Sequence, residues 1–161
     1  MITQQQALEA FEYRDGELYW KVPKSIRIKV GDKCDGMDCH GYKRVRYNGK
    51  LYRVHRIIFL MFNGYLPQYI DHINCDRADN RIENLREVNA IENACNRAMQ
   101  SNNRTKVKGV IWRKNIKHYE VSVQVNKVKN YCGIFKDLEL AELVAIEARD
   151  KYHKQFAYKG K

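Results

Sequence analysis

The sequence contains no uninterrupted apolar stretch of the length that crosses a membrane. Its first residues, MITQQQALEAFEY, also lack the basic-then-apolar order of a secretory signal peptide. The sequence therefore shows neither a membrane-spanning segment nor an export signal. We therefore expect a protein of the cytoplasm that has no membrane partner.

The cysteines show no pairing pattern. The chain has five cysteines, an odd number, and none of them forms a CxxC pair. Such a set supports neither a disulfide framework nor a zinc knuckle, so free thiols are expected. Cys34 and Cys39 could meet across a turn, but a metal there would need two further ligands, and His40 is the only nearby candidate.

Acidic residues are outnumbered by basic ones. The 161 residues include 30 Lys and Arg against 19 Asp and Glu, which gives a net charge of +11. A charge of this sign and size points to a polyanionic partner. The chain is short for two large domains, but it can hold two or three compact modules.

A dense polar segment dominates what is present. Residues 69–96 read YIDHINCDRADNRIENLREVNAIENACN and contain Asp71, His72, Asn84 and Asn93. An imidazole that titrates near neutral pH can take a proton from water, as phosphodiester hydrolysis requires. The carboxylate of Asp71 and the amide oxygen of Asn93 are hard ligands of the kind that Mg²⁺ or Mn²⁺ prefers.

Local signals place these residues on expected elements. Asp71 and His72 are neighbours, so on a regular strand they would point to opposite faces, and one site needs the strand to end or twist there. The turn residues that follow are consistent with a strand end. Asn89 and Glu92 have the spacing of a capping box, which puts Asn93 about one turn into a short helix.

This segment resembles the HNH endonuclease signature of phage type, in which an Asp-His pair ends a strand, an Asn-rich loop follows and a helix supplies a final Asn. The resemblance implies a ββα-metal site in which His72 activates water and Asp71 and Asn93 hold one Mg²⁺ or Mn²⁺ ion. It implies that Asn84 steadies His72, with Asn80 as the rival for that role. The family often has Gly where this chain has Cys75.

The residues before this segment predict a strand-rich N-terminal module, 1–54. A helix is expected from about Thr3 to Phe11, and hairpins are expected around Asp15-Gly16 and Asn48-Gly49. Alternation in the second hairpin puts Arg44 and Arg46 on one face, where they are candidates for phosphate contact or simply a solvated face.

The run HRIIFLMFNG, which Gly64 ends, predicts a short buried helix that packs under the nuclease hairpin. His55, at its start, is expected to be structural. The nuclease module then spans residues 55–96, and the polar residues 97–106 are interpreted as a linker. Arg97, Arg104 and Lys106 are its candidates for DNA contact.

The last module, 107–161, predicts three strands, roughly 108–114, 118–125 and 128–135, and then an amphipathic helix from about 138 to 154 with Asp137 as its N-cap. Residues including Gly109-Val110, Trp112-Arg113, Gly133-Ile134-Phe135 and Ala141 resemble the AP2 DNA-binding domain, which is a three-stranded sheet backed by one helix.

Charge divides the two faces of this module. Residues 106–136 have eight Lys or Arg against one acid, whereas residues 137–154 have five acids against three bases. The sheet is therefore expected to meet the polyanion. A sheet can enter the major groove. The candidates for DNA contact are Arg113, Lys114, Tyr119, Gln124 and Lys127.

The sequence thus predicts an α+β protein with an N-terminal β-hairpin module, a central ββα-metal nuclease and a C-terminal sheet-plus-helix module. The expected function is metal-dependent hydrolysis of double-stranded DNA. The expected state is a monomer or weak dimer. With one site per chain, a monomer is expected to nick one strand, and a double-strand break would need a dimer or two binding events. The resemblance implies a phage homing-type enzyme in the cytoplasm of an infected bacterium. The first alternative is a sequence-specific DNA-binding regulator with an inactive HNH fold, and the second is a structure-specific or RNA-directed binder.

Overall fold

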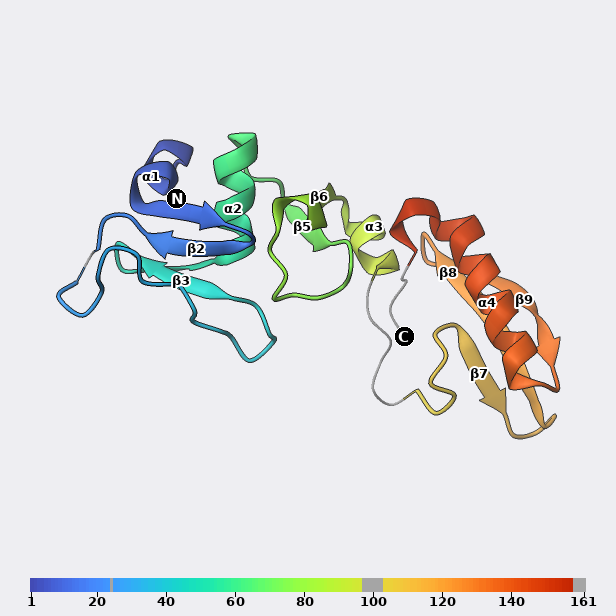
Figure 1. Ribbon diagram of the computed structural model, residues 1–161. Helices are drawn as coiled ribbons and strands as arrows, with labels where there is room; N and C mark the ends of the chain where they lie inside the picture. The colour runs from blue at the N-terminus through green and yellow to red at the C-terminus, as the bar shows by residue number, and fades with distance from the viewer. Residues whose placement is uncertain (24, 97–102, 158–161) are drawn as a thin grey trace. The chain divides into compact units, whose positions relative to one another are not determined.

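The computed structural model describes residues 1–23, 25–96 and 103–157 (Figure 1). The chain divides into two compact units, Met1–Val88 and Asn89–Lys161. None of the helices in the described ranges is long and apolar enough to cross a membrane. Mixed helices and small antiparallel sheets confirm the expected α+β class.

Unit 1 begins with helix α1 (Gln4–Ala10), which Thr3 caps through a capping box with Gln6. Strands β1 (Phe11–Arg14) and β2 (Glu17–Trp20) follow as an antiparallel hairpin. The turn residues Asp15 and Gly16 have φ angles of 45° and 81°, as a two-residue hairpin turn requires. The expected helix and the first expected hairpin are confirmed.

The second hairpin joins β3 (Arg44–Tyr47) to β4 (Lys50–Arg53) through Asn48 and Gly49, whose φ angles are both positive. Val45 and Tyr47 of β3 are buried, whereas the alternate residues of that strand are exposed. Helix α2 (Val54–Asn63) follows directly and ends at Gly64 in the left-handed conformation. The expected buried helix is thereby confirmed.

The third hairpin of unit 1 pairs β5 (Tyr69–His72) with β6 (Leu85–Val88), with the short 3₁₀ turn η1 (Ile82–Asn84) before β6. One hydrophobic cluster runs from Ile2 to Leu85 and includes most of α2. The expected N-terminal module and the expected nuclease hairpin therefore share a single core in unit 1. The boundary between residues 54 and 55 stays a prediction.

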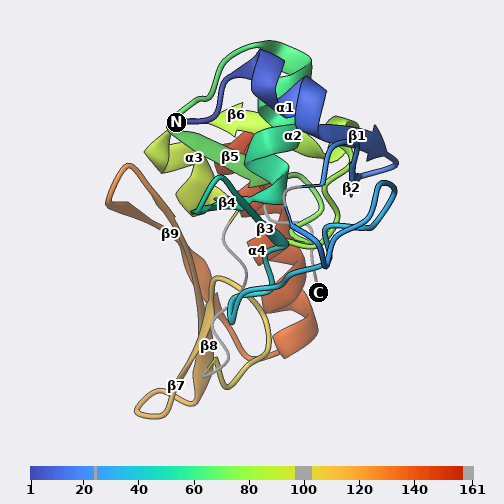
Figure 2. The same ribbon diagram turned by 90° about the vertical axis from the view of Figure 1, so that its left-hand side faces the viewer.

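Unit 2 begins with helix α3 (Ala90–Cys95), capped by Asn89 and Glu92 as expected. Strands β7 (Val110–Arg113), β8 (His118–Val125) and β9 (Val128–Phe135) form one antiparallel sheet. Helix α4 (Leu138–His153), capped by Asp137, lies along one face of this sheet and leads into η2 (Lys154–Phe156) (Figures 1 and 2).

Small residues let α4 approach the sheet closely. Ala141 and Ala145 are fully buried and form a core with Val107, Val110 and Val121. The expected order of three strands and one helix is confirmed. The resemblance of this module to AP2 domains stays a prediction.

Candidate active site

His72 lies at the end of β5 and is only 4% exposed. The register of the β5–β6 hairpin pairs His72 with buried Leu85, and it pairs Asp71 with Arg86. Because adjacent strand residues point to opposite faces, the hairpin sends the imidazole into the core and the carboxylate to the other side. The structure thus separates the side chains of these two neighbours.

Two rings pack against the His72 imidazole. The His55 ring lies with its centroid 5.0 Å from that of His72 at an interplanar angle of 80°, and the Tyr42 ring lies 6.0 Å away. His55 is itself 3% exposed. The expectation that His55 is structural leaves out this contact, which only the fold creates.

Asn80 holds the His72 imidazole directly. His72 Nε2 lies 3.0 Å from Asn80 Oδ1. An amide oxygen only accepts hydrogen bonds, so the ring nitrogen donates in this contact and the lone pair of the neutral ring lies on Nδ1. Burial lowers the pKa of His72, while the Asn80 hydrogen bond and the charges of nearby Asp residues oppose that shift. The imidazole is therefore neutral near pH 7, the form that accepts a proton.

Two buried polar atoms near His72 lack hydrogen-bond partners among the described residues. They are Nδ1 of His55 and Nδ2 of Asn80. Burial is also the main reason why the pKa of His55 falls to about 3, so this ring stays neutral. An unpaired buried polar group costs about 1–3 kcal/mol, and such groups are uncommon in folded proteins. Their occurrence beside one imidazole is more typical of a functional site than of a simple core.

Asn84 organises the loop that follows β5. Its Nδ2 donates to Asn74 Oδ1 and to the carbonyl of Asp79, at 3.0 and 2.8 Å, and its Oδ1 accepts from the Asn74 backbone N–H at 3.0 Å. We expected Asn84 to contact His72, with Asn80 as the alternative, and in the structure Asn80 makes this contact. The two amides therefore divide the work between ring and loop.

The β1–β2 hairpin packs against the end of the loop between β5 and β6. A Cβ on Gly16 would lie 2.7 Å from the backbone nitrogen of Arg81, so only glycine fits at this approach. Tyr13 Oη accepts a hydrogen bond from the Ile82 N–H at 3.2 Å. Sequence spacing contains no signal for this support, because the partners are more than 60 residues apart.

Asp71 forms an ion pair with Arg86. Its Oδ2 accepts from Arg86 Nη2 at 2.8 Å and from Nε at 3.1 Å, and its side chain is 11% exposed. Asn93, the other expected ligand, lies on α3 in unit 2. The described residues contain no group of three or more His, Cys, Asp or Glu arranged to hold a metal.

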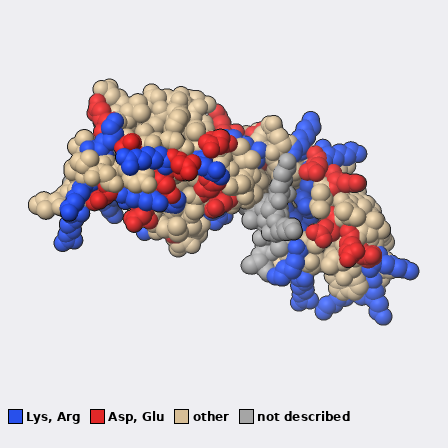
Figure 3. Space-filling view, viewed as in Figure 1, with Lys and Arg blue, Asp and Glu red and all other residues tan. Residues whose placement is uncertain are grey.

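The expected DNA contacts of unit 1 are at the surface. Arg44 and Arg46 are exposed on β3, and in Figure 3 a row of basic atoms lies over the place that β3 has in Figure 1. Arg97 lies outside the described residues, whereas Arg104 and Lys106 are exposed in the turns that precede β7.

The expected contacts of unit 2 fall on different faces of the sheet. Lys114 and Lys127 are exposed in the two hairpin turns, and Gln124 is exposed on β8. Arg113 is paired with Glu120, at 2.7 Å between Nε and Oε2. Tyr119 packs against the core under α4 instead, so its assignment to DNA stays a prediction that the packing does not favour.

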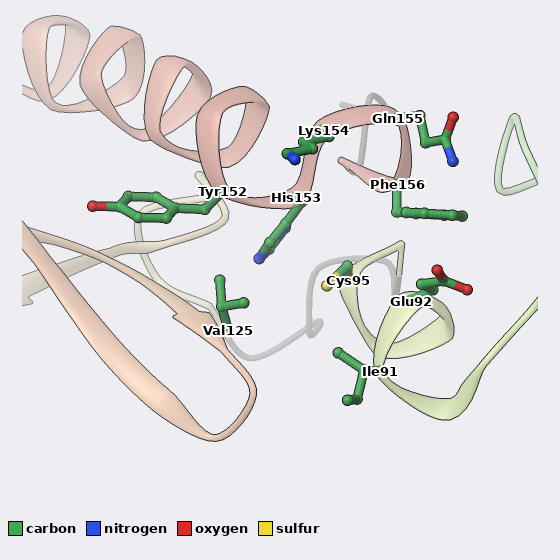
Figure 4. Close-up of a pocket in the computed structure, with 9 residues that line it drawn as sticks. All are labelled: Ile91, Glu92, Cys95, Val125, Tyr152, His153, Lys154, Gln155 and Phe156. Carbon is green, nitrogen blue, oxygen red and sulfur yellow. The ribbon is translucent and has the colours of Figure 1, made fainter.

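A separate cavity of about 420 Å³ opens in unit 2, between α3 and the corner where α4 meets η2 (Figure 4). Ile91 and Cys95 of α3 lie opposite Val125 and His153 in this view. Its lining is mostly apolar, and none of its residues belongs to the cluster around His72.

Comparison with known proteins bears on the hairpin region. Residues 52–95 match a family model described as HNH endonuclease. The matched segment contains Asp71, His72, Asn80, Asn84 and Asn93 as well as His55. No curated protein and no solved structure matches the chain.

Proposed function

We propose that this protein is a metal-dependent DNA endonuclease in which His72 is the general base. The observation that carries the proposal is the buried, neutral His72 imidazole, held by Asn80 inside a segment similar to HNH endonucleases. A neutral imidazole whose orientation is fixed can take the proton of a water that attacks phosphorus. Asn84 preserves the loop that carries Asn80, and so acts on the same ring indirectly.

The donor chemistry of Asp71 fits a hard divalent ion. Mg²⁺ or Mn²⁺ would be held by the Asp71 carboxylate, with Asn93 as the second expected ligand, and would offset negative charge on the phosphate. In the free protein, the Arg86 guanidinium balances the negative charge of Asp71. A metal ion would therefore compete with Arg86 for this carboxylate.

Unit 2 is proposed to position the nuclease on double-stranded DNA. Lys114 and Lys127 are exposed in the turns of the sheet and Gln124 is exposed on β8, whereas helix α4 is acidic. Arg44 and Arg46 are the proposed phosphate contacts of unit 1, and Arg97, Arg104 and Lys106 those of the connecting segment. One site per chain favours a nick by a monomer, whereas a weak dimer could break both strands. A phage homing-type role follows from the resemblance alone.

A second candidate is a DNA-binding regulator with an inactive nuclease fold. The ion pair between Asp71 and Arg86 favours it, because the carboxylate is already compensated without a metal. The two functions differ in one observable, which is hydrolysis that depends on a divalent ion.

The test is relaxation of supercoiled plasmid by the purified protein in Mg²⁺, in Mn²⁺ and in chelator. We expect open circles with either ion, and a loss of about 10²–10⁴-fold in rate for His72→Ala, which is the usual contribution of a general base. His40→Ala is the matched control, because His40 is an exposed loop residue outside the buried ring cluster. Plasmid that is bound but uncut under every metal condition would favour the regulator.

A further inference from the structure

Two arginines from different segments of unit 1 lie over one tyrosine ring beside His72. The guanidinium carbon of Arg53, at the end of β4, is 4.2 Å from the centroid of Tyr42, and that of Arg77, in the loop after β5, is 5.1 Å from it. The ring centroids of Tyr42 and His72 are 6.0 Å apart. Both guanidinium groups therefore stack on a ring that itself packs against the proposed general base.

Both guanidinium groups are held in place yet remain accessible. Arg77 Nη1 donates to the carbonyl of His40 at 2.9 Å, and its side chain belongs to an exposed residue. The side chain of Arg53 is 46% exposed. A guanidinium that stacks on an aromatic face keeps the N–H groups in its own plane for other acceptors, and that fork matches the oxygens of a phosphate.

The ring that carries them is fixed by its own turn. The carboxylate of Asp38 accepts hydrogen bonds from the backbone N–H groups of His40 and Tyr42, at 2.8 and 3.0 Å. These backbone bonds lower the pKa of Asp38, so it stays ionised. Asp38 therefore holds the turn and lies 3.8 Å from Arg53, at the outer limit of an ion pair.

Positive charge at this place exceeds what the protein neutralises. Arg44 and Arg53 face one another directly across the β3–β4 hairpin. Like charges in such positions destabilise a hairpin. Among the described residues, neither Arg44 nor Arg77 forms an ion pair with a carboxylate. A surface of this kind is complementary to an anion that it lacks in the free protein.

We propose that Arg53 and Arg77, stacked on Tyr42, form a clamp for a backbone phosphate of the DNA strand that His72 attacks. Arg44 adds to the positive field from the opposite strand of the hairpin. The clamp rests on the proposed nuclease function, and it adds a substrate-binding site that neither the motif nor the charge pattern identifies. Its ligand is the phosphodiester group, so it grips the backbone independently of sequence.

The first arm of the test measures binding, which requires no cleavage. Full-length protein is titrated with a short DNA duplex in chelator over a range of salt concentrations. Arg53→Gln and Arg77→Gln should each reduce the slope of log affinity against log salt, because each removes part of the contact with the clamped phosphate. The double variant loses the whole contact with that phosphate, so its slope should fall by about one.

Arg14→Gln is the matched control. Arg14 also stacks on a tyrosine, with its guanidinium carbon 4.8 Å from the Tyr19 centroid, and it is exposed and ion-paired with Glu12. Its salt slope should equal that of the wild type. Arg53→Lys and Arg77→Lys keep the charge but lose the planar fork, so they should retain most of the slope. Should either Gln variant fail to fold, the Lys variants decide the matter, because loss of the fork should lower their affinity at a fixed salt concentration, whereas Arg14→Lys should bind as the wild type does.

The second arm measures cleavage of the same duplex in Mg²⁺ at concentrations below saturation. We expect kcat/KM to fall roughly tenfold for each Gln variant, the equivalent of about 1.4 kcal/mol, and to be unchanged for Arg14→Gln. If His72→Ala is inactive but both Gln variants match Arg14→Gln in slope and rate, the clamp is wrong and the nuclease stands. If the wild type never cuts, the proposed function fails, and the slopes alone still judge the clamp. Wild-type protein that binds no duplex would overturn both.

Discussion

The candidate sites of the two units use ionisable groups in opposite ways. Unit 1 buries His55 and His72 side by side and keeps both rings neutral. Unit 2 leaves Lys114 and Lys127 exposed in the turns of its sheet. Burial tunes a group for chemistry, whereas exposure preserves charge for long-range attraction to a polyanion. The contrast agrees with the proposed roles, in which unit 1 hydrolyses DNA and unit 2 helps to position it.

The proposed role of His72 in unit 1 is tested most directly by comparing single variants of Asn80 and Asn84. Asn80→Ala removes the hydrogen bond between Asn80 and the ring, and misplacing a catalytic group can lower the rate about 10²-fold. Asn84→Ala instead removes three loop contacts and should lower the free energy of unfolding by about 1–3 kcal/mol.

Plasmid-nicking rates and urea denaturation of both variants check this pair. Asn80→Ala should stay folded at the assay temperature and cut slowly, while Asn84→Ala should show the larger loss of stability. The same fall in rate and in stability for both variants would remove the distinction between ring and loop.

The metal assignment is tested by Asp71 and its partner. Asp71→Asn should raise the Mn²⁺ concentration needed for half-maximal cleavage by about 10–100-fold, a range typical for losses at metal sites. Arg86→Gln should lower that concentration, because the guanidinium no longer competes for Oδ2. Asn93→Ala tests the other expected ligand in the same titration. An unchanged metal requirement in Asp71→Asn would exclude Asp71 as a ligand.

Acid should destabilise unit 1 through its buried imidazole. The folded-state pKa of His55 is about 3, because of burial first and then of the nearby His72, Arg53 and Arg56, with Asp38 opposing the shift. In the unfolded chain it is about 6.5. Below pH 6.5 the unfolded state binds a proton that the native ring does not. Stability is therefore full above that pH and declines by up to about 1.4 kcal/mol per unit as pH falls toward 3.

Denaturation curves at about pH 7.5 and about pH 4, on either side of the ordinary His pKa, check this. His55→Gln is the comparison. The variant should be less stable at neutral pH but should lose less on acidification. Parallel pH profiles for the two proteins would show that His55 is not the group responsible.

The smallest effect is expected in unit 2. Replacing Lys114 and Lys127 by Gln should weaken DNA binding and lower the salt slope by about two in total, without changing the rate at saturating DNA. Lys151→Gln, on the acidic helix α4, is the control and should bind as the wild type does. A larger loss for Lys151→Gln than for the sheet variant would reverse the assignment of the faces.

Much of the fold could be predicted because its signals are local. Thr3, Asn89 and Asp137 cap the helices expected from sequence, and Asp15-Gly16 and Asn48-Gly49 turn the expected hairpins. Capping and turn formation involve residues within a few positions of each other, so a sequence displays them directly. The segment similar to HNH endonucleases is local for the same reason.

The sequence by itself therefore determined the elements, the charge of the two faces of unit 2 and the identity of His72 as the central candidate. Only the tertiary structure decided what surrounds that ring: Asn80 rather than Asn84, the His55 and Tyr42 rings, and the arginines stacked on Tyr42. The ion pair between Asp71 and Arg86 is likewise visible only in the tertiary structure. These contacts join residues from separate segments through packing in one shared core, and no periodicity or spacing along the chain encodes such distances.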